Sequence, residues 1–289
     1  MNIEYYLITK SICLDSNQWS IFIGIVSVFL TILGFVIAFI IYKRQRSDNA
    51  CDAFNFFQGF LPPLKDAVTS TIESLEEFDS SLKDSNDNFR IPVLYSSLSD
   101  RFLNKINIVD LNRYYLSKNK IKHEILKSFI VNSNFIGDYL NYFTTQIDFF
   151  REHYKEKENI YSEWQLLRSN KFFASVYDNK EDIAYKSFYA NWVKDFNNDT
   201  EIFEFNEDGI PQSVISRKLL VSKHIDKLRH EVFPFIAQSE KANEINLIAN
   251  KIVMAYEDIE LFKNRMSRTI SQDLLKFKEI LEELNNLME

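Results

Sequence analysis

The sequence predicts an all-α protein in which a single N-terminal transmembrane helix precedes a cytoplasmic helical bundle. Near the N-terminus, the chain has a long run of apolar residues without any charge. The segments behind this run repeat apolar residues at spacings of three and four, as expected for one face of an α-helix. The last third of the chain carries the most regular of these repeats.

The apolar run has the length and composition of a membrane span. No charged residue occurs from Ser16 to Tyr42, and 16 of the 21 residues from Ile21 to Ile41 are Ile, Leu, Phe or Val. A helix of that length spans roughly 31 Å, which matches a bilayer core of about 30 Å. The run is too long for the apolar region of a signal peptide, and Lys-Arg-Gln-Arg follows it in place of a cleavage site. We therefore expect residues 19–42 to be an uncleaved transmembrane helix rather than a buried core helix.

Charges on either side of this span predict its orientation. Three cations, Lys43, Arg44 and Arg46, follow the span, whereas one lysine and two acidic residues precede it. Cationic flanks stay on the cytoplasmic side, so residues 1–18 are expected to form a short extracytoplasmic tail and the C-terminal domain to be cytoplasmic. The 26 Asn residues, with abundant Lys, Ile and Phe, are typical of an AT-rich bacterial genome. The membrane is therefore expected to be the bacterial inner (plasma) membrane.

All the small residues between positions 20 and 38 lie on one side of the expected helix. They form the small-residue seam, which comprises Ser20, Gly24, Ser27, Thr31, Gly34 and Ala38. Their spacing alternates between four and three residues, a repeat that suits left-handed helix packing. Because small side chains let transmembrane backbones approach closely, the seam predicts self-association or pairing with another membrane helix. A weakly polar seam that lines a pore within a ring of copies is the alternative.

The charge and composition of the remaining chain restrict its partners. Residues 47–289 contain 30 basic and 39 acidic residues, a balance that disfavours indiscriminate binding to nucleic acid or anionic lipid. Only three glycines lie outside the span, so the chain has no Gly-rich phosphate-binding loop, and no cofactor is expected. Cys13 and Cys51 lie on opposite sides of the expected membrane and cannot form a disulfide within one chain.

Behind the span, the helix is expected to continue through the juxtamembrane residues 43–61. Four phenylalanines in this stretch, at positions 54, 56, 57 and 60, form a face suited to docking. Pro62–Pro63 is expected to turn the chain and to open the cytoplasmic all-helical domain, residues 62–289. A further helix is expected from Pro92 to Ile106.

The C-terminal part, about residues 212–289, is expected to fold as three long helices. Apolar stripes with heptad-like spacing occur within residues 214–235, 245–262 and 277–288, as in an antiparallel bundle or a coiled-coil extension. Ahead of this part, Asn206 to Gly209 predicts a turn with a short strand pair around it.

Few residue combinations point to chemistry, and the four histidines lack the spacing of a metal site. A basic helix within residues 215–232 stands out in the acidic domain; its cations are Arg217, Lys218, Lys223, Lys227 and Arg229. Arg217 and His224 are seven residues apart, so an ideal helix places them on one face. Such a pair can bind a phosphate and supply a general acid or base. The alternative is a basic surface helix that balances acidic neighbours.

The Arg217-x6-His224 spacing resembles the Arg-x4-6-His pattern of HEPN ribonucleases. This resemblance implies metal-independent RNA cleavage by Arg217 and His224, at a site formed where two such helices meet in a dimer. The match covers eight residues, and Lys218 stands where that family often has a polar residue. Nucleic acid is an expected partner only under this alternative.

The whole chain resembles membrane-anchored accessory proteins of bacterial anti-phage systems, including abortive-infection proteins and single-pass ancillary proteins of RNA-targeting CRISPR loci. One N-terminal anchor followed by an Asn- and Lys-rich helical domain carries this likeness. The resemblance implies homo-oligomers that perturb the inner membrane when infection is sensed.

We therefore expect an oligomeric, non-enzymatic inner-membrane protein of a defence system. It would act by membrane perturbation or pore formation, or by docking a cytosolic partner. The alternatives are a membrane-tethered HEPN-like ribonuclease and a passive membrane tether or sensor for a partner protein.

Overall fold

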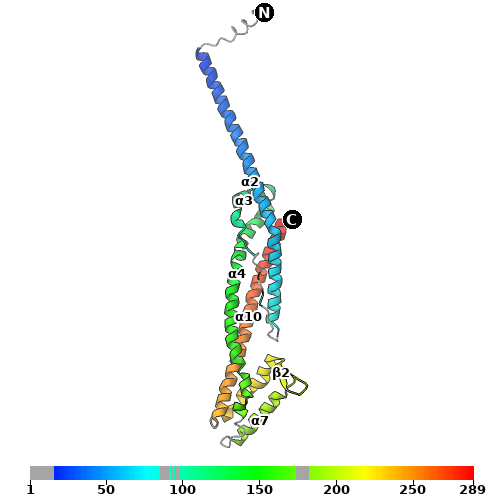
Figure 1. Ribbon diagram of the computed structural model, residues 1–289. Coiled ribbons are helices and arrows are strands. Elements are labelled where there is room, and N and C mark those ends of the chain that lie inside the picture. Colours follow the sequence, from blue (N-terminus) through cyan, green and yellow to red (C-terminus); the bar gives the residue numbers. More distant parts are fainter. Residues whose placement is uncertain (1–15, 85–90, 93, 95–97, 174–181) are drawn as a thin grey trace, which may run out of the picture. The chain divides into compact units, whose positions relative to one another are not determined.

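The computed structural model describes residues 16–84, 91, 92, 94, 98–173 and 182–289, without the side chains of Ser16, Asn170 and Phe173 (Figure 1). Helices make up 83% of the structure, so the prediction of a mostly helical protein is confirmed. Residues 1–15 of the predicted tail, with Cys13, lie outside the described residues. The chain divides into two compact units, residues 1–61 with 101–126 and residues 62–100 with 127–289.

Helix α2 begins at Ser16 and ends at Leu82, and it contributes to both units. The turn predicted at Pro62–Pro63 is wrong, because both prolines lie inside this helix. A proline in a helix interior removes a hydrogen bond and costs about 3 kcal/mol or more. Burial offsets this cost, since Leu64 and Val68 of the second unit are buried and each such side chain contributes about 1.5–3 kcal/mol.

In the first unit, α2 packs against helix α3 (Ile108–Lys118) and the chain that leads into it. Phe54 stacks on Tyr114 with ring centroids 4.1 Å apart, and Phe60 stacks on Phe102 at 5.3 Å. The phenylalanine face that the sequence suggested for docking is therefore partly covered by the chain itself.

The helix predicted from Pro92 to Ile106 is also wrong. Among the described residues of this stretch, only the 3-10 turn η1 (Leu103–Lys105) is helical. Asn107 provides the reason, because its side-chain oxygen accepts hydrogen bonds from the backbone N–H groups of Val109 and Asp110, at 3.0 and 3.3 Å. An asparagine that caps the following helix favours a break in the helix before it.

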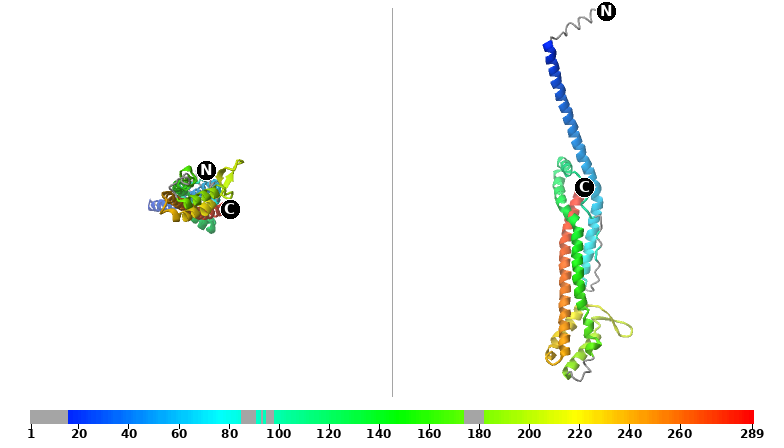
Figure 2. Two further views of the ribbon diagram at one scale, coloured as in Figure 1. Left: turned by 90° about the horizontal axis from the view of Figure 1, so that it is seen from below. Right: turned by 60° about the vertical axis from the view of Figure 1, so that its left-hand side comes forward.

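Three helices lie side by side in the second unit and form the bundle (Figures 1 and 2). They are α2 from residue 62, α4 (Lys120–Tyr161) from residue 127, and α10 (Glu240–Met288). Polar pairs join α4 to α10: Asn132 with Glu283 (2.8 Å), Tyr139 with Asp273 (3.0 Å) and Lys157 with Asp258 (3.0 Å). Residue numbers rise along α4 as they fall along α10, so these two helices are antiparallel.

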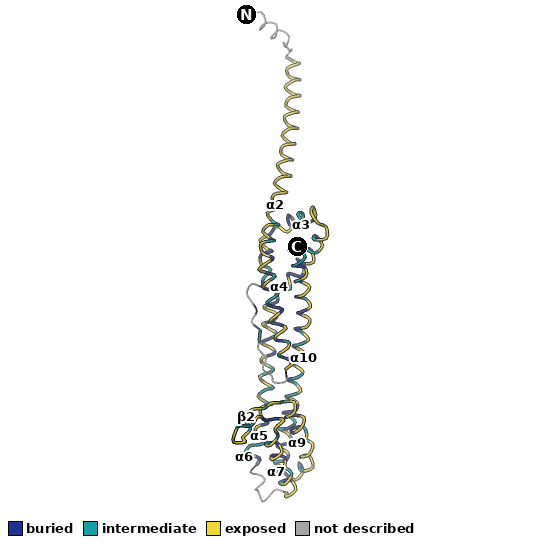
Figure 3. The backbone as a smooth tube through the Cα atoms, turned by 90° about the vertical axis from the view of Figure 1, so that its right-hand side faces the viewer, coloured by how far each residue is buried: buried dark blue, intermediate teal, exposed yellow. Residues whose placement is uncertain are grey.

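The three long helices predicted for residues 212–289 are wrong, because α10 alone takes up 49 of these residues. Buried and half-buried side chains repeat along α10 at alternating spacings of four and three from Ile245 to Leu287. This is the heptad pattern of a coiled coil, and Figure 3 shows the buried positions along the bundle helices. Lys263 and Asp273 occupy two of these positions, and their polarity made one helix resemble two.

The head comprises residues 161–240 of the second unit. Its elements are α5 (Trp164–Leu167), α6 (Asn170–Phe173), α7 (Ile183–Asn197), β1 (Phe203–Phe205), β2 (Pro211–Val214), α8 (Arg217–Leu219), the π-helix η3 (Leu220–Ile225), α9 (Asp226–Glu231) and the 3-10 turn η4 (Phe233–Phe235). Four aromatic residues on one side of α7, Tyr185, Tyr189, Trp192 and Phe196, are buried. Their successive rings stack with centroids 6.1, 5.8 and 5.0 Å apart, so this helix supplies much of the core of the head.

The turn predicted from Asn206 to Gly209 is present, with antiparallel strands on either side of it. Gly209 has φ +74°, which glycine adopts without steric cost. The Asn206 side chain accepts a hydrogen bond from the backbone N–H of Ile210 at 2.8 Å. Local turn chemistry therefore suffices to place this hairpin.

Candidate functional site

The N-terminal part of α2 is long and apolar enough to cross a membrane once. Its length and composition fit a single membrane span or a signal sequence. Every side chain from Asn17 to Tyr42 is exposed. Within the described chain, this large apolar surface therefore has no covering element, which is unusual for a helix in water.

The small-residue seam lies on this exposed part of α2. A Cβ atom added at Gly24 or Gly34 would meet no heavy atom within 4 Å. The Thr31 hydroxyl donates to the backbone oxygen of Ser27 at 2.8 Å, so its hydrogen-bonding need is met inside the helix. The packing of a single chain therefore does not require small residues at Gly24 and Gly34.

His224, the second residue of the predicted Arg-His pair, is buried in the head. Its Nε2 lies 2.8 Å from Oδ2 of Asp199, and its ring meets Phe196 edge-on with centroids 5.2 Å apart. The backbone oxygen of His224 accepts a hydrogen bond from Nε1 of Trp192 at 3.2 Å. These contacts hold the imidazole in one orientation, as a carboxylate partner does in acid–base sites.

The π-helix η3 carries His224. Leu220 to Ile225 form i→i+5 hydrogen bonds, which place more residues in each turn than an α-helix has. The π-turn rotates His224 around the helix axis relative to Arg217, so the same-face expectation for an ideal α-helix does not apply. Such turns often occur at functional sites.

Arg217, the first residue of the predicted pair, binds to helix α4. Its guanidinium makes two hydrogen bonds to the Glu158 carboxylate, one of them 2.8 Å from Nη2 to Oε1. It also lies 3.4 Å from the Tyr154 hydroxyl and 5.0 Å from the centre of the Tyr161 ring. A two-pronged Arg–carboxylate pair with an aromatic neighbour is a strong, directional anchor.

The structure does not bring Arg217 and His224 together within one chain. Arg217 is tied to Glu158, His224 is tied to Asp199, and the two residues line different pockets. A shared phosphate-binding site within the monomer is therefore not formed by this pair.

Most other cations of the basic helix also contact carboxylates. Their ion pairs are Lys223 with Asp199 (2.6 Å) and Glu201 (2.7 Å), Lys227 with Glu231 (3.7 Å), and Arg229 with Asp226 (2.5 Å). Because these pairs neutralise much of the positive charge locally, the basic helix presents less net charge than its sequence suggests.

Asp199 is the centre of the cluster around His224. Burial acts to raise the pKa of the Asp199 carboxyl, but hydrogen bonds from His224, Lys223 and the backbone N–H of Glu201 together lower that pKa to about 2. A pocket of about 530 Å³ adjoins this cluster, and none of the described residues that line it carries a hydroxyl or thiol. The pocket therefore offers hydrogen-bonding and charged groups but no side-chain nucleophile of that kind.

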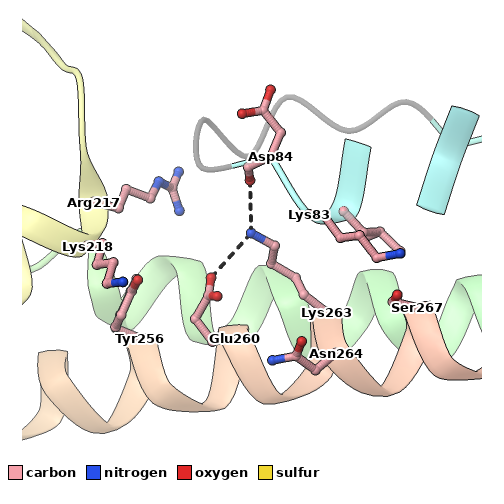
Figure 4. A pocket seen from close by; sticks show the side chains of 10 residues that line it. Lys83, Asp84, Arg217, Lys218, Tyr256, Glu260, Lys263, Asn264 and Ser267 are labelled. Atoms are coloured by element: carbon pink, nitrogen blue, oxygen red, sulfur yellow. Dashed lines mark hydrogen bonds and ion pairs between the residues drawn. The ribbon is translucent and has the colours of Figure 1, made fainter. Parts of the chain in front are cut away.

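A smaller pocket of about 280 Å³ lies beside Arg217, and Figure 4 shows its side chains. Arg217 and Lys218 reach it from α8, and Lys263 reaches it from α10. Lys263 is buried, and its Nζ lies 3.2 Å from Glu260 Oε1 and 3.3 Å from the backbone oxygen of Asp84. Lys83 also lines the pocket. Three of its four cations, Lys83, Arg217 and Lys263, have carboxylate partners, which leaves the pocket with little excess charge.

Among the residues that the structure describes, no three His, Cys, Asp or Glu side chains are arranged to hold a metal ion. Cys51 is a free, exposed thiol. A metal centre built from the described residues therefore has no candidate ligand set.

Sequence reasoning did not identify the partners of Arg217 and His224. Asp199 lies 25 residues from His224, and Glu158 lies 59 residues from Arg217. No local motif joins residues at such separations. The apolar periodicity of α7 was the one available signal, because it places Trp192 and Phe196 on the face that packs beside His224.

In comparisons with known proteins, no family model, no curated protein and no solved structure matches this chain. The fold and the site together define a class: a mostly helical protein with one long apolar N-terminal helix, a three-helix bundle and a head that contains a buried His–Asp pair. A function has to be sought in the surfaces that this arrangement leaves exposed.

Proposed function

We propose that this protein is a single-pass bacterial inner-membrane protein that assembles with copies of itself through the small-residue seam. Residues 19–42 cross the membrane, the N-terminus lies outside, and the bundle and head lie in the cytoplasm. The isolation of the seam carries the proposal, because no atom of the described chain packs on the exposed apolar helix at Gly24 or Gly34. A row of small residues that the monomer does not use fits close approach of a second helix.

The plan of one anchor and a cytoplasmic helical domain supports a role in anti-phage defence, through its resemblance to membrane-anchored accessory proteins. In that role, the assembled spans perturb the membrane or form a pore, or the head docks a cytosolic defence protein. The exposed apolar span and the pocket beside His224 are the two surfaces that support these modes of action.

Substitution of Gly24 and Gly34 tests the proposal directly. Gly24→Leu and Gly34→Leu should each lower the mass of the detergent-solubilised complex and abolish activity, because leucine keeps the two backbones apart. Neither change should disturb the monomer, since both Cβ positions are open. Light scattering coupled to size-exclusion chromatography measures the mass.

Val36→Leu is the matched control, because Val36 is exposed and lies on the opposite side of the helix from the seam. It should leave the mass of the complex unchanged. If both glycine variants kept the wild-type mass, assembly through the seam would be ruled out.

The ribonuclease alternative finds less support in the geometry. Arg217 and His224 are each held by a separate carboxylate and line separate pockets, so an active site from this pair requires both to exchange partners. A passive tether does not require Arg217 and His224 to exchange partners. Replacement of the N-terminal anchor by an unrelated one distinguishes such a tether from a protein that acts by assembling.

A further inference from the structure

A basic pocket lies in the first unit directly behind the apolar part of α2. Its volume is about 590 Å³, and its four cations are Lys43, Arg46, Arg113 and Lys118. Tyr114, Ser117 and Ser47 add hydroxyl groups to the lining, and none of the described residues that line the pocket is acidic. A pocket with four cations, three hydroxyls and no carboxylate has the chemistry of a phosphate site.

Two helices hold these cations in place. Lys43 and Arg46 belong to α2 within about one turn of Tyr42, the last residue of the expected span, whereas Arg113 and Lys118 belong to α3. The stacking of Tyr114 on Phe54, with centroids 4.1 Å apart, fixes α3 against α2. The four cations therefore line one pocket between two helices, α2 and α3, that pack against each other.

The ion pairs of the described residues leave most of this charge uncompensated. Arg113 pairs with Asp110 on its own helix, whereas Lys43, Arg46 and Lys118 have no carboxylate partner among the described residues. In the basic helix of the head, by contrast, most cations contact carboxylates. The local charge is therefore positive here, although residues 47–289 as a whole are acidic.

Helix α3, which supplies part of the pocket lining, also carries apolar side chains on its solvent-exposed side. Val109 is 65% exposed and Leu116 is 54% exposed, and their spacing of seven residues places them on one face of the helix. A short helix with an exposed apolar face beside a cluster of basic residues resembles helices that lie in a membrane interface.

We propose that this pocket binds the phosphate of an anionic membrane lipid. The inference rests on the proposed function, since the pocket lies at the membrane surface when residues 19–42 span the bilayer. Basic pockets just inside the cytoplasmic leaflet are suited to anionic headgroups, and Arg46 and Arg113 offer the guanidinium geometry that matches a phosphate. The ligand is a phosphodiester lipid such as phosphatidylglycerol, and Val109 and Leu116 rest in the interface around it.

Lipid retention by the full chain tests this binding. Protein extracted in mild detergent is mixed with equal amounts of phosphatidylglycerol and phosphatidylcholine, and native mass spectrometry counts the lipids that remain bound. The wild type should retain phosphatidylglycerol preferentially. Arg46→Gln/Lys118→Gln should lower that preference roughly 25-fold, since neither cation has a carboxylate partner among the described residues and each cation near an anionic surface contributes about fivefold.

Lys194→Gln/Lys251→Gln is the matched control, because it removes two cations from the second unit. It should retain phosphatidylglycerol as the wild type does. Cys51 lines the pocket and is exposed, so it provides a second measurement: in a Cys13→Ser background, phosphatidylglycerol should slow its alkylation by a neutral maleimide and phosphatidylcholine should not.

Equal retention of the two lipids by the wild type, or unchanged retention in Arg46→Gln/Lys118→Gln, would rule out lipid binding at this pocket without affecting the proposed span or its assembly. If glycerol 3-phosphate slowed the alkylation of Cys51 as strongly as the same concentration of phosphatidylglycerol did, the pocket would be assigned to a soluble phosphate instead. If the full chain were soluble without detergent, the proposed function and this inference would both be wrong.

Discussion

At the scale of single residues, the informative positions are polar side chains in the core. Asp273 is buried on α10 and accepts a hydrogen bond from the Tyr139 hydroxyl at 3.0 Å. Burial raises the pKa of the Asp273 carboxyl to about 6, although the Tyr139 hydrogen bond opposes this. Asp199 differs because three donors reach it, and its pKa falls to about 2. The number of hydrogen-bond donors that reach each carboxyl, more than its burial, thus decides whether its pKa is raised or lowered.

The raised pKa of Asp273 predicts an unusual pH dependence of stability. The folded protein holds this proton more tightly than the unfolded chain, so the contribution of Asp273 to stability improves as pH falls from about 7 to about 4. At pH 7.5, ionisation of Asp273 lowers the free energy of unfolding by at most about 3 kcal/mol. Asp273→Asn should therefore raise the free energy of unfolding at pH 7.5, with an advantage that shrinks toward pH 4.5.

Urea unfolding of the solubilised full chain at several pH values measures this difference. Asp148→Asn is the control, because the Asp148 side chain is 66% exposed, and it should differ little from the wild type at any pH. An advantage of Asp273→Asn that stayed constant across the range would contradict the predicted proton uptake.

Single residues also show how much of the candidate site the sequence alone could predict. The seam and the apolar run depend on neighbours within one helix, so spacing alone predicts Gly24 and Gly34 as packing positions, and their role in assembly stays a prediction. His224 depends on Asp199 and on a π-turn, and neither is encoded by local periodicity. The predicted Arg217–His224 pair assumed an ideal α-helix, and that assumption fails at Leu220 to Ile225.

At the scale of elements, α10 organises the second unit. Its heptad positions continue without interruption from Ile245 to Leu287, and its polar members have partners on other elements. Lys263 meets the backbone of Asp84, and Asp273 meets Tyr139. These partners are distant in sequence, which is why apolar spacing predicted two helices where a single one forms. The helical class was predictable, whereas the length of this helix required the tertiary contacts.

The heptad assignment predicts different costs for two truncations on α10. Ile270 is fully buried at a heptad position, whereas Leu275 is 71% exposed. Ile270→Ala should lower the free energy of unfolding by about 2–5 kcal/mol, and Leu275→Ala should change it by less than about 0.5 kcal/mol. Urea denaturation followed by circular dichroism measures both. Similar costs for the two variants would show that this face of α10 has been misassigned.

At the scale of the whole molecule, the chain separates its large exposed apolar surface from its packed cores by sequence region. The exposed apolar surface precedes residue 43, the basic pocket follows it, and the aromatic core and the His224–Asp199 pair belong to the second unit. Phe54 stacks on Tyr114 of α3 and Phe60 stacks on Phe102, whereas Phe56 is 41% exposed, so the docking face that the sequence suggested is only partly covered. The proposed role of residues 19–42 as a membrane span can therefore be tested by exchanging this segment alone.

Replacement of residues 1–42 by an unrelated single-span anchor without small residues tests whether the span does more than hold the protein in place. The exchange keeps Lys43 and Arg46 and so preserves the basic pocket. Because the replaced side chains from 17 to 42 are exposed, the chimaera should remain in the membrane fraction with the helicity and unfolding midpoint of the wild type. Its detergent-solubilised mass should fall at least twofold, and protection of a bacterial host from phage should be lost. A chimaera that protected the host fully while running as a smaller species would instead establish the passive tether, since localisation would then suffice and assembly through the seam would not be needed.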